Sequence, residues 1–138
     1  MIRRHAVDGV VVSNTTLARP KGLDPVFAAE TGGLSGDPLF RRSTAMLARF
    51  SKAIGPDLPI VGVGGVSDGE TAFQKIAAGA SLVQVYTALV FKGPRLVRRL
   101  HEGLALALAA RGFRTPAEAV GCGRDDWALV PLDTDERP

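Results

Sequence analysis

The sequence predicts an α/β fold in which three parallel strands alternate with helices. Three short runs rich in valine, isoleucine and leucine, at residues 8–13, 59–66 and 81–86, have the composition of strands buried on both faces. Segments with apolar residues at helical spacing lie between and after these runs. Strands that alternate with helices form parallel sheets through crossover connections. A closed barrel of eight such units takes about 250 residues, so 138 residues indicate a partial barrel or a small open sheet.

The connection after the first strand, residues 14–36, is unusually long and contains four glycines, three of them in the stretch 31–36. Long connections without secondary structure are uncommon in compact domains and are usually functional or disordered. Glycine lets the backbone approach a flat ligand closely. A flexible linker is the alternative, but a linker rarely leads straight into a well-capped helix. We therefore expect this loop to contribute to a binding site.

Capping signals predict where the first two long helices begin. A helix is expected over residues 37–54, because Asp37 is a suitable N-cap and Pro38 suits the first helical position. Ser67 and Glu70 form a capping-box pattern that begins the next helix. The inward stripe of the first of these helices is predicted to consist of Leu39, Ser43, Leu47, Phe50 and Ile54.

A third long helix is predicted over residues 94–111, and a short one follows Thr115. Beyond it, residues 124–138 form a polar tail that we expect to fray, except where Trp127 and Leu129 dock. The inward stripe of the long helix is predicted to consist of Val97, Leu100, Leu104 and Leu108.

Composition argues against several classes of function. The net charge of +3 comes from scattered Lys and Arg residues, which does not predict nucleic-acid binding. The single cysteine, Cys122, is expected to pack as a small hydrophobe, and it excludes a disulfide framework and suits a reducing compartment. His5 and His101 lack metal-ligand spacing, and His101 is predicted to lie on the surface. We expect neither a signal peptide, because no apolar run follows Met1–His5, nor a membrane span, because no apolar run in the sequence is long enough.

Ligands of α/β proteins bind where the carboxyl ends of parallel strands meet. At these ends, Gly64 and Gly65 leave backbone N–H groups open to a phosphate, and Thr87 adds a hydroxyl before a short helix. A glycine-rich strand exit that serves only a tight turn is the alternative. The side chains of Asn14 and Thr15 suit a small planar polar ligand, although both residue types are also common in turns.

Five segments in matching order and spacing resemble the class 2, quinone-dependent dihydroorotate dehydrogenases. They read VSNTT at 12–16, TGGLSG at 31–36, IVGVGGV at 60–66, GASLVQVYT at 79–87 and FKGP at 91–94. The likeness covers residues from about 3 to 121. It implies an α/β fold that corresponds to the C-terminal portion, strands 6–8 and their helices, of a (β/α)8 TIM barrel. The implied domain is a partial FMN-binding barrel over residues 1–123, followed by the polar tail at 124–138.

The resemblance also implies roles for individual residues. The family pattern places substrate, dihydroorotate or orotate, against Asn14 and Thr15. No residue of this chain is implied as the catalytic base and none as a metal ligand. The positions that the pattern assigns to the cofactor FMN are Ser13, Gly36, Gly65, Tyr86 and Thr87.

The implied reaction is the oxidation of dihydroorotate to orotate in pyrimidine biosynthesis. A base removes a proton, a hydride passes to FMN, and the electrons continue to a membrane quinone. In the family that base is a serine on an earlier barrel loop, which this chain does not contain, so we expect the chain alone to bind FMN weakly and to be inactive. The full-length enzyme would associate peripherally with the inner cell membrane, whereas the fragment itself would be cytoplasmic and bind no nucleic acid. The alternatives are another phosphate-binding barrel enzyme and a non-catalytic remnant.

Overall fold

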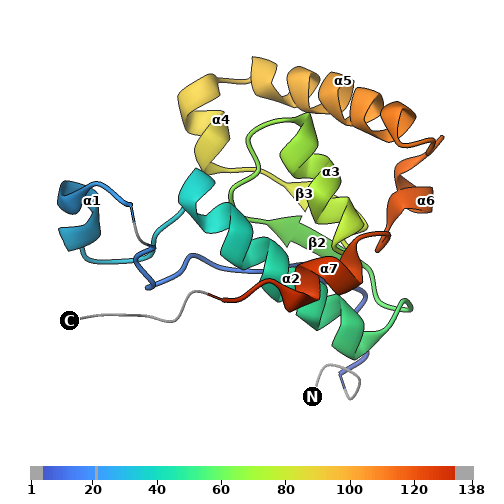
Figure 1. Cartoon of the computed structure of the whole chain (residues 1–138), viewed down its shortest axis with the longest axis horizontal. Helices are drawn as coiled ribbons and strands as arrows, with labels where there is room; N and C mark the ends of the chain where they lie inside the picture. The colour runs from blue at the N-terminus through green and yellow to red at the C-terminus, as the bar shows by residue number, and fades with distance from the viewer. Residues whose placement is uncertain (1–4, 21, 133–138) are drawn as a thin grey trace.

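Three parallel strands lie at the centre of the computed structural model, which describes residues 5–20 and 22–132 (Figure 1). The strands are β1 (Val10–Val12), β2 (Ile60–Val63) and β3 (Leu82–Gln84), and their order in the sheet follows their order in the chain. Each strand is shorter than predicted but lies within its predicted run, so the parallel α/β arrangement is confirmed. The register pairs Val10 with Ile60, Val12 with Gly62, Gly62 with Val83 and Val63 with Gln84.

Helices cover one face of this sheet, and α1 lies apart from them in the loop after β1 (Figure 1). A 3-10 turn, η2, leads directly into α2. The bounds are α1 Pro25–Ala29, η2 Asp37–Leu39, α2 Phe40–Ile54, α3 Gly69–Ala77, α4 Thr87–Lys92, α5 Arg95–Ala110, α6 Pro116–Ala119 and α7 Arg124–Leu129.

The two faces of the sheet differ in burial. On the helical face, Val12 and Ile60 are buried in a cluster with Leu47 of α2. On the opposite face, Val11 is 56% exposed and Leu82 is 63% exposed. The prediction that the strands are buried on both faces is therefore wrong, because no element in the described part of the chain covers this second face. We call it the open face of the sheet.

The helical layer is held together by close packing of α3 against α5. Phe73 and Ile76 of α3 are buried in one cluster with Leu108 of α5. Full burial of side chains of this size stabilises a fold by roughly 1.5–3 kcal/mol each. The two helices touch at glycines, because a Cβ atom on Gly69 would lie 2.2 Å from the carbonyl carbon of Gly103. Larger residues here would force the helices apart.

The two predicted helix caps differ from the caps in the structure. The N-cap of α3 is Asp68, whose carboxylate accepts a hydrogen bond of 2.8 Å from the Thr71 backbone N–H. The predicted box of Ser67 and Glu70 is wrong, because the Thr71 hydroxyl already accepts from the backbone N–H groups at the start of the helix. Asp37 is likewise the first residue of η2 rather than the N-cap of α2, which begins without a side-chain cap.

The predicted inward stripes are confirmed in α2 and partly wrong in α5. Leu39, Ser43 and Leu47 are buried, and Phe50 and Ile54 are half-buried. In α5, Leu100 and Leu108 are buried and Leu104 is half-buried, as predicted. Val97 is 44% exposed instead, because the neighbouring Leu96 occupies the inward position beside α3 and α4. His101 is exposed, as expected.

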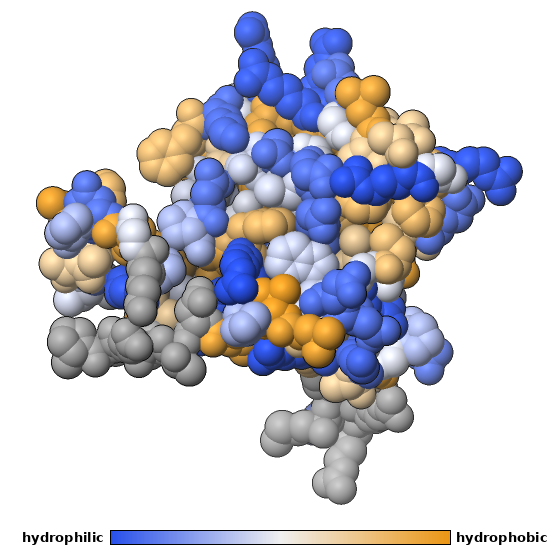
Figure 2. Space-filling model, in the orientation of Figure 1, coloured by the Kyte–Doolittle hydropathy of each residue, from blue (hydrophilic) through white to orange (hydrophobic). Residues whose placement is uncertain are grey.

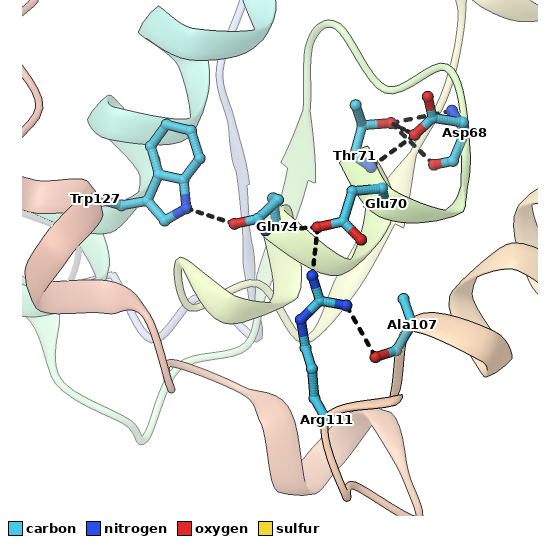
Figure 3. A network of polar contacts seen from close by, with 7 residues as sticks. All are labelled: Asp68, Glu70, Thr71, Gln74, Ala107, Arg111 and Trp127. Carbon is cyan, nitrogen blue, oxygen red and sulfur yellow. Dashed lines mark hydrogen bonds and ion pairs between the residues drawn. The ribbon is translucent and has the colours of Figure 1, made fainter. Parts of the chain in front are cut away.

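The segment that was expected to fray contains helix α7, which packs on α2 (Figure 1). Trp127 docks as predicted, with its ring 5.8 Å from the Phe40 ring and its indole N–H donating to Gln74 at 2.9 Å (Figure 3). The expectations for Leu129 and Cys122 are wrong. Leu129 is 80% exposed because only one side of α7 faces α2, and Cys122 is exposed in the turn that precedes α7. Residues 133–138 of the predicted tail lie outside the described residues.

The polar network in Figure 3 connects α3, α5 and α7. Glu70 accepts from Gln74 at 2.8 Å and from Arg111 at 2.7 Å, and Arg111 also donates to the Ala107 carbonyl at 3.0 Å. The upper surface in Figure 2, where α5 lies, is mixed, with hydrophilic side chains beside hydrophobic ones; Leu106 of α5 is 72% exposed. Among the described residues, no helix has both the length and the hydropathy of a membrane-spanning segment.

Candidate functional site

A cavity of about 420 Å³ lies at the carboxyl ends of the three strands. Its walls come from these strand ends, from the last two residues of the loop at 14–36, from η2 and from the start of α4. Concave sites of this size are typical of small-molecule binding. All seven residues singled out from the sequence line it: Ser13, Asn14, Thr15, Gly36, Gly65, Tyr86 and Thr87.

The end of β1 brings three polar side chains to this cavity. Ser13 is half-buried, whereas Asn14 and Thr15 are exposed. The Asn14 amide oxygen accepts a hydrogen bond of 2.8 Å from the Thr15 backbone N–H, which fixes the amide at the strand exit. Its N–H groups have no partner among the described residues. The hydroxyls and this amide therefore form one polar wall.

The loop at 14–36 is not structureless, since its two limbs are tied together. Thr16 and Leu34 exchange two backbone hydrogen bonds, of 3.2 and 2.7 Å. The Arg19 guanidinium donates to the carbonyls of Glu30 at 2.7 Å and Gly32 at 2.9 Å. Backbone carbonyls that are held by a charged donor keep their place better than those that face only water. Arg19 thus fixes the glycine-rich limb beside the end of β1.

Glycine is required where this limb meets its neighbours. A Cβ atom on Gly33 would lie 1.9 Å from the Thr15 hydroxyl oxygen. Gly36 has φ 76°, in the left-handed region that favours glycine, and its Cβ would lie 3.3 Å from the Thr87 methyl group. The Thr87 hydroxyl donates to the Ser35 hydroxyl at 3.0 Å. The loop and the start of α4 therefore form one continuous wall.

At the end of β2, the backbone approaches the first turns of α2. Gly64 and Gly65 have φ values of 102° and 73°. A Cβ atom on Gly65 would lie 2.4 Å from the Phe40 Cα atom, and one on Gly64 would lie 2.9 Å from the Ser43 hydroxyl oxygen. These two glycines thus serve both the backbone conformation and the close approach of helix to strand.

Lys75 of α3 lies buried behind this strand end, and the sequence analysis missed it. Its ammonium donates to the Ser43 hydroxyl at 2.6 Å and to the Val63 carbonyl at 3.3 Å, and it lies 5.3 Å from the centre of the Phe40 ring. Burial lowers the pKa of Lys75 from 10.5 to about 7. A helical lysine is normally exposed. Its position three residues after the buried Ala72 is the signal that places it on the inward face.

Three polar residues that line the cavity were also missed. Ser35 lies in the glycine-rich segment at 31–36 and is the hydrogen-bond partner of Thr87, which was predicted; its place in that segment is the signal for it. Gln84 lies on the open face of the sheet, two residues after Leu82, and the period-two alternation of β3 is the signal for it. Asp37 is the only charged side chain among the described lining residues.

The donors at this cavity suit a phosphate monoester attached to a flat polar group. Hydroxyls, the amides of Asn14 and Gln84, and the glycine backbone at the end of β2 are neutral donors of the kind that hold phosphate without basic side chains. Val11, Val63 and Val66 add apolar surface for a ring. The residues present therefore fit a phosphate-bearing ring cofactor.

Comparison with known proteins identifies the relatives of this chain. The family model for dihydroorotate dehydrogenase matches residues 1–108. The dihydroorotate dehydrogenase (quinone) of Cereibacter sphaeroides is 54% identical over 121 residues, which are 88% of this chain and 34% of that protein. The corresponding enzyme of Rhizobium johnstonii is 52% identical over 124 residues, which are 90% of this chain and 34% of that protein.

Solved structures agree with these relatives. A ligand-free dihydroorotate dehydrogenase from Eimeria tenella superposes with a TM-score of 0.83 at 36% identity, over 88% of this chain and 33% of that one. A complex of the Eimeria tenella enzyme with ferulenol gives a TM-score of 0.79 at 38% identity, over 83% of this chain and 30% of that one. The chain thus spans about a third of the length of the proteins it matches.

Proposed function

Because this chain belongs to the dihydroorotate dehydrogenase family, we propose that it forms the phosphate-side wall of the FMN site of a quinone-linked dihydroorotate dehydrogenase. The observation that carries the proposal is that Ser13, Gly65 and Thr87, from three different strand ends, line one cavity. In this proposal β1, β2 and β3 are strands 6–8 of a (β/α)8 barrel. The exposed valine and leucine side chains on the open face of the sheet support it, because a barrel interior would bury them.

The phosphate of FMN would lie at the ends of β2 and β3. Gly65 offers backbone N–H without a Cβ atom in the way, and Thr87 offers both a hydroxyl and an N–H. Tyr86, which lines the cavity at the end of β3, would lie beside the phosphate as well. Gly36 would lie by its backbone against the flavin, and Ser13 would contact the flavin from the end of β1.

Asn14 and Thr15 would orient dihydroorotate or orotate. The Asn14 amide can donate to ring carbonyl oxygens, and the Thr15 hydroxyl can donate to the carboxylate. Orientation by such donors places the substrate for reaction. When bound, FMN supplies the acceptor for the hydride. The proposal extends to a quinone as the final electron acceptor and to peripheral membrane association of the whole enzyme.

A binding experiment tests the proposal on the chain itself. FMN and riboflavin are titrated into the purified chain, and quenching of flavin fluorescence is recorded. We expect weak but measurable binding of FMN, and binding of riboflavin weaker by about tenfold, because a phosphate held by several donors adds at least 1.4 kcal/mol. Equal affinity for the two ligands would contradict the proposed phosphate site. Binding of inorganic phosphate with no preference for the flavin would favour another phosphate-binding barrel enzyme.

A matched pair of serine variants sharpens the test. Ser35→Ala removes the partner of the Thr87 hydroxyl inside the cavity. Ser81→Ala removes an exposed serine at the opposite end of β3. We expect the first change to weaken FMN binding about threefold to tenfold, as for the loss of one hydrogen bond, and the second to leave it unchanged. Dihydroorotate-dependent bleaching of flavin absorbance, recorded on the same samples, measures whether the chain turns over.

A further inference from the structure

The cavity contains no basic side chain among the described residues that line it. A phosphate monoester carries close to two negative charges at neutral pH, and the carboxylate of Asp37 in the cavity wall opposes it. Neutral donors alone would have to offset this charge. The nearest buried positive charge that the structure records lies one layer behind the cavity, on Lys75.

Lys75 is bonded to the strand end that forms the cavity wall. Its ammonium donates to the Val63 carbonyl and to the Ser43 hydroxyl. The Ser43 hydroxyl lies 3.0 Å from the Gly64 carbonyl oxygen and 3.1 Å from the Phe40 carbonyl oxygen, so it can donate its hydrogen bond to either one. A continuous chain of hydrogen bonds therefore leads from Lys75 to the glycine whose backbone lines the cavity.

Nothing else in the surroundings neutralises this ammonium. No carboxylate in residues 5–20 and 22–132 pairs with Lys75, and β2 contains no titratable residue. On α3, Glu70 is engaged with Arg111 and Asp68 caps the helix. The charged groups of α2 are Arg41, Arg42, Arg49 and Lys52. Of these, Arg41 and Arg49 donate to carbonyls at 128–131, and Lys52 pairs with a carboxylate of α7.

We propose that Lys75 is a positioning residue of the phosphate site: it holds the carbonyl end of β2 and takes up a proton when a phosphate monoester binds at Gly64 and Gly65. This inference rests on the proposed function, because it requires that phosphate occupies this part of the cavity. The physical reason is mutual attraction. An anion beyond the strand end stabilises the ammonium behind it, and the ammonium stabilises the anion by the same free energy. The lowered pKa of Lys75, about 7, puts this exchange in an accessible pH range.

The first arm of the test needs no ligand. Backbone ¹H–¹⁵N signals of Gly64 and Gly65 are followed from pH 6 to pH 9 in the full chain. We expect them to shift with a midpoint near 7 in the wild type and not in Lys75→Met. The control Lys52→Met removes the same charge from an exposed position and should leave the midpoint unchanged. If the chemical shifts of Gly64 and Gly65 did not change with pH in the wild type, the inference would be overturned.

The second arm measures FMN and riboflavin affinity at pH 7 and pH 9. If binding raises the pKa of Lys75 by about one unit, the affinity for FMN should fall severalfold, up to tenfold, between these values. Riboflavin affinity should not change, nor should FMN affinity of Lys75→Met. Ser43→Ala keeps the lysine and breaks the link to Gly64, so it serves if the Lys75 variant does not fold, and it should reduce the pH effect.

The two proposals fail in different ways. FMN affinity that is independent of pH and equal in wild type and Lys75→Met would overturn the role of Lys75 and leave the FMN site standing. A chain that binds neither FMN nor riboflavin would refute the proposed function. The proton-uptake claim would then fall with it, while the glycine signals still decide whether Lys75 controls the strand end.

Discussion

Replacing Lys75 by methionine should change how the stability of this chain depends on pH. The unfolded chain holds a proton on this lysine up to pH 10.5, whereas burial lowers the pKa of the folded state to about 7. Between these two values the unfolded state binds more protons than the folded state. The free energy of unfolding therefore rises with pH across this window, and the buried lysine costs most below pH 7.

The magnitude follows from the size of the shift. Each unit of pKa difference corresponds to about 1.4 kcal/mol. Half of the folded molecules are already neutral at Lys75 at pH 7, so the gain from pH 7 to pH 9 is about 2 kcal/mol. Methionine fills a similar volume without a charge, so Lys75→Met should be at least as stable as the wild type near pH 7. The advantage of the variant should shrink as the pH rises.

Urea unfolding followed by the fluorescence of Trp127, the single tryptophan, measures both proteins at several pH values. The quantity of interest is the difference between the two free energies of unfolding, since it cancels the groups that both proteins share. Lys52→Met serves as the control, because its exposed lysine contributes little. Parallel curves for wild type and Lys75→Met between pH 7 and pH 9 would refute the reasoning.

Two further changes test the packing around the site. Gly65→Ala should lower the free energy of unfolding by at least about 2 kcal/mol more than Gly55→Ala, as measured in urea. Both glycines have left-handed φ, but only at Gly65 does the new methyl group collide with the Phe40 backbone; equal losses would show that conformation alone matters. Trp127→Phe keeps the ring and removes the indole donor to Gln74, so it should cost about 1 kcal/mol in thermal or urea unfolding, whereas an unchanged midpoint would show that α7 is held by apolar contacts alone.

The sequence predicted the types and order of the major elements because local signals dominate there. The helix predicted to end at residue 54 does so, with Gly55 following it in left-handed φ. The short α1 in the predicted loop was not foreseen, although Asp24 caps it and Pro25 begins it. A helix of five residues is shorter than two turns, so it gives no periodicity to detect.

The errors concern contacts between elements that lie far apart in the chain. Val11 is exposed because only further elements could bury the open face of the sheet. The composition of a strand does not reveal whether such elements are present. Leu96 replaces Val97 inside because neighbouring helices set the rotation of α5. The docking of Trp127 was foreseen, but the helix around it was not, since six residues are too few to show a helical period.

The site residues were predictable for a different reason. Parallel strands bring their carboxyl ends to one edge of the sheet, so residues far apart in the chain meet once the strands are identified. Ser13, Gly65 and Thr87 therefore reached one cavity as the strand order required. Lys75 was not predictable in this way, because helical spacing could indicate an inward position for it, but only packing reveals that it lies behind a strand end.

The glycines and the lysine at the end of β2 have a common physical cause. The strand carries glycine where α2 and α3 press against it: a Cβ atom on Gly62 would lie 2.8 Å from Leu47 and 3.3 Å from the Lys75 Cβ atom. This close approach excludes water from the lysine and brings its ammonium within reach of the strand carbonyls. A bulkier strand end would push both helices outward, hydrate the ammonium and return its pKa toward 10.5. Changes at Gly62 should therefore alter stability, the pH response and ligand affinity together.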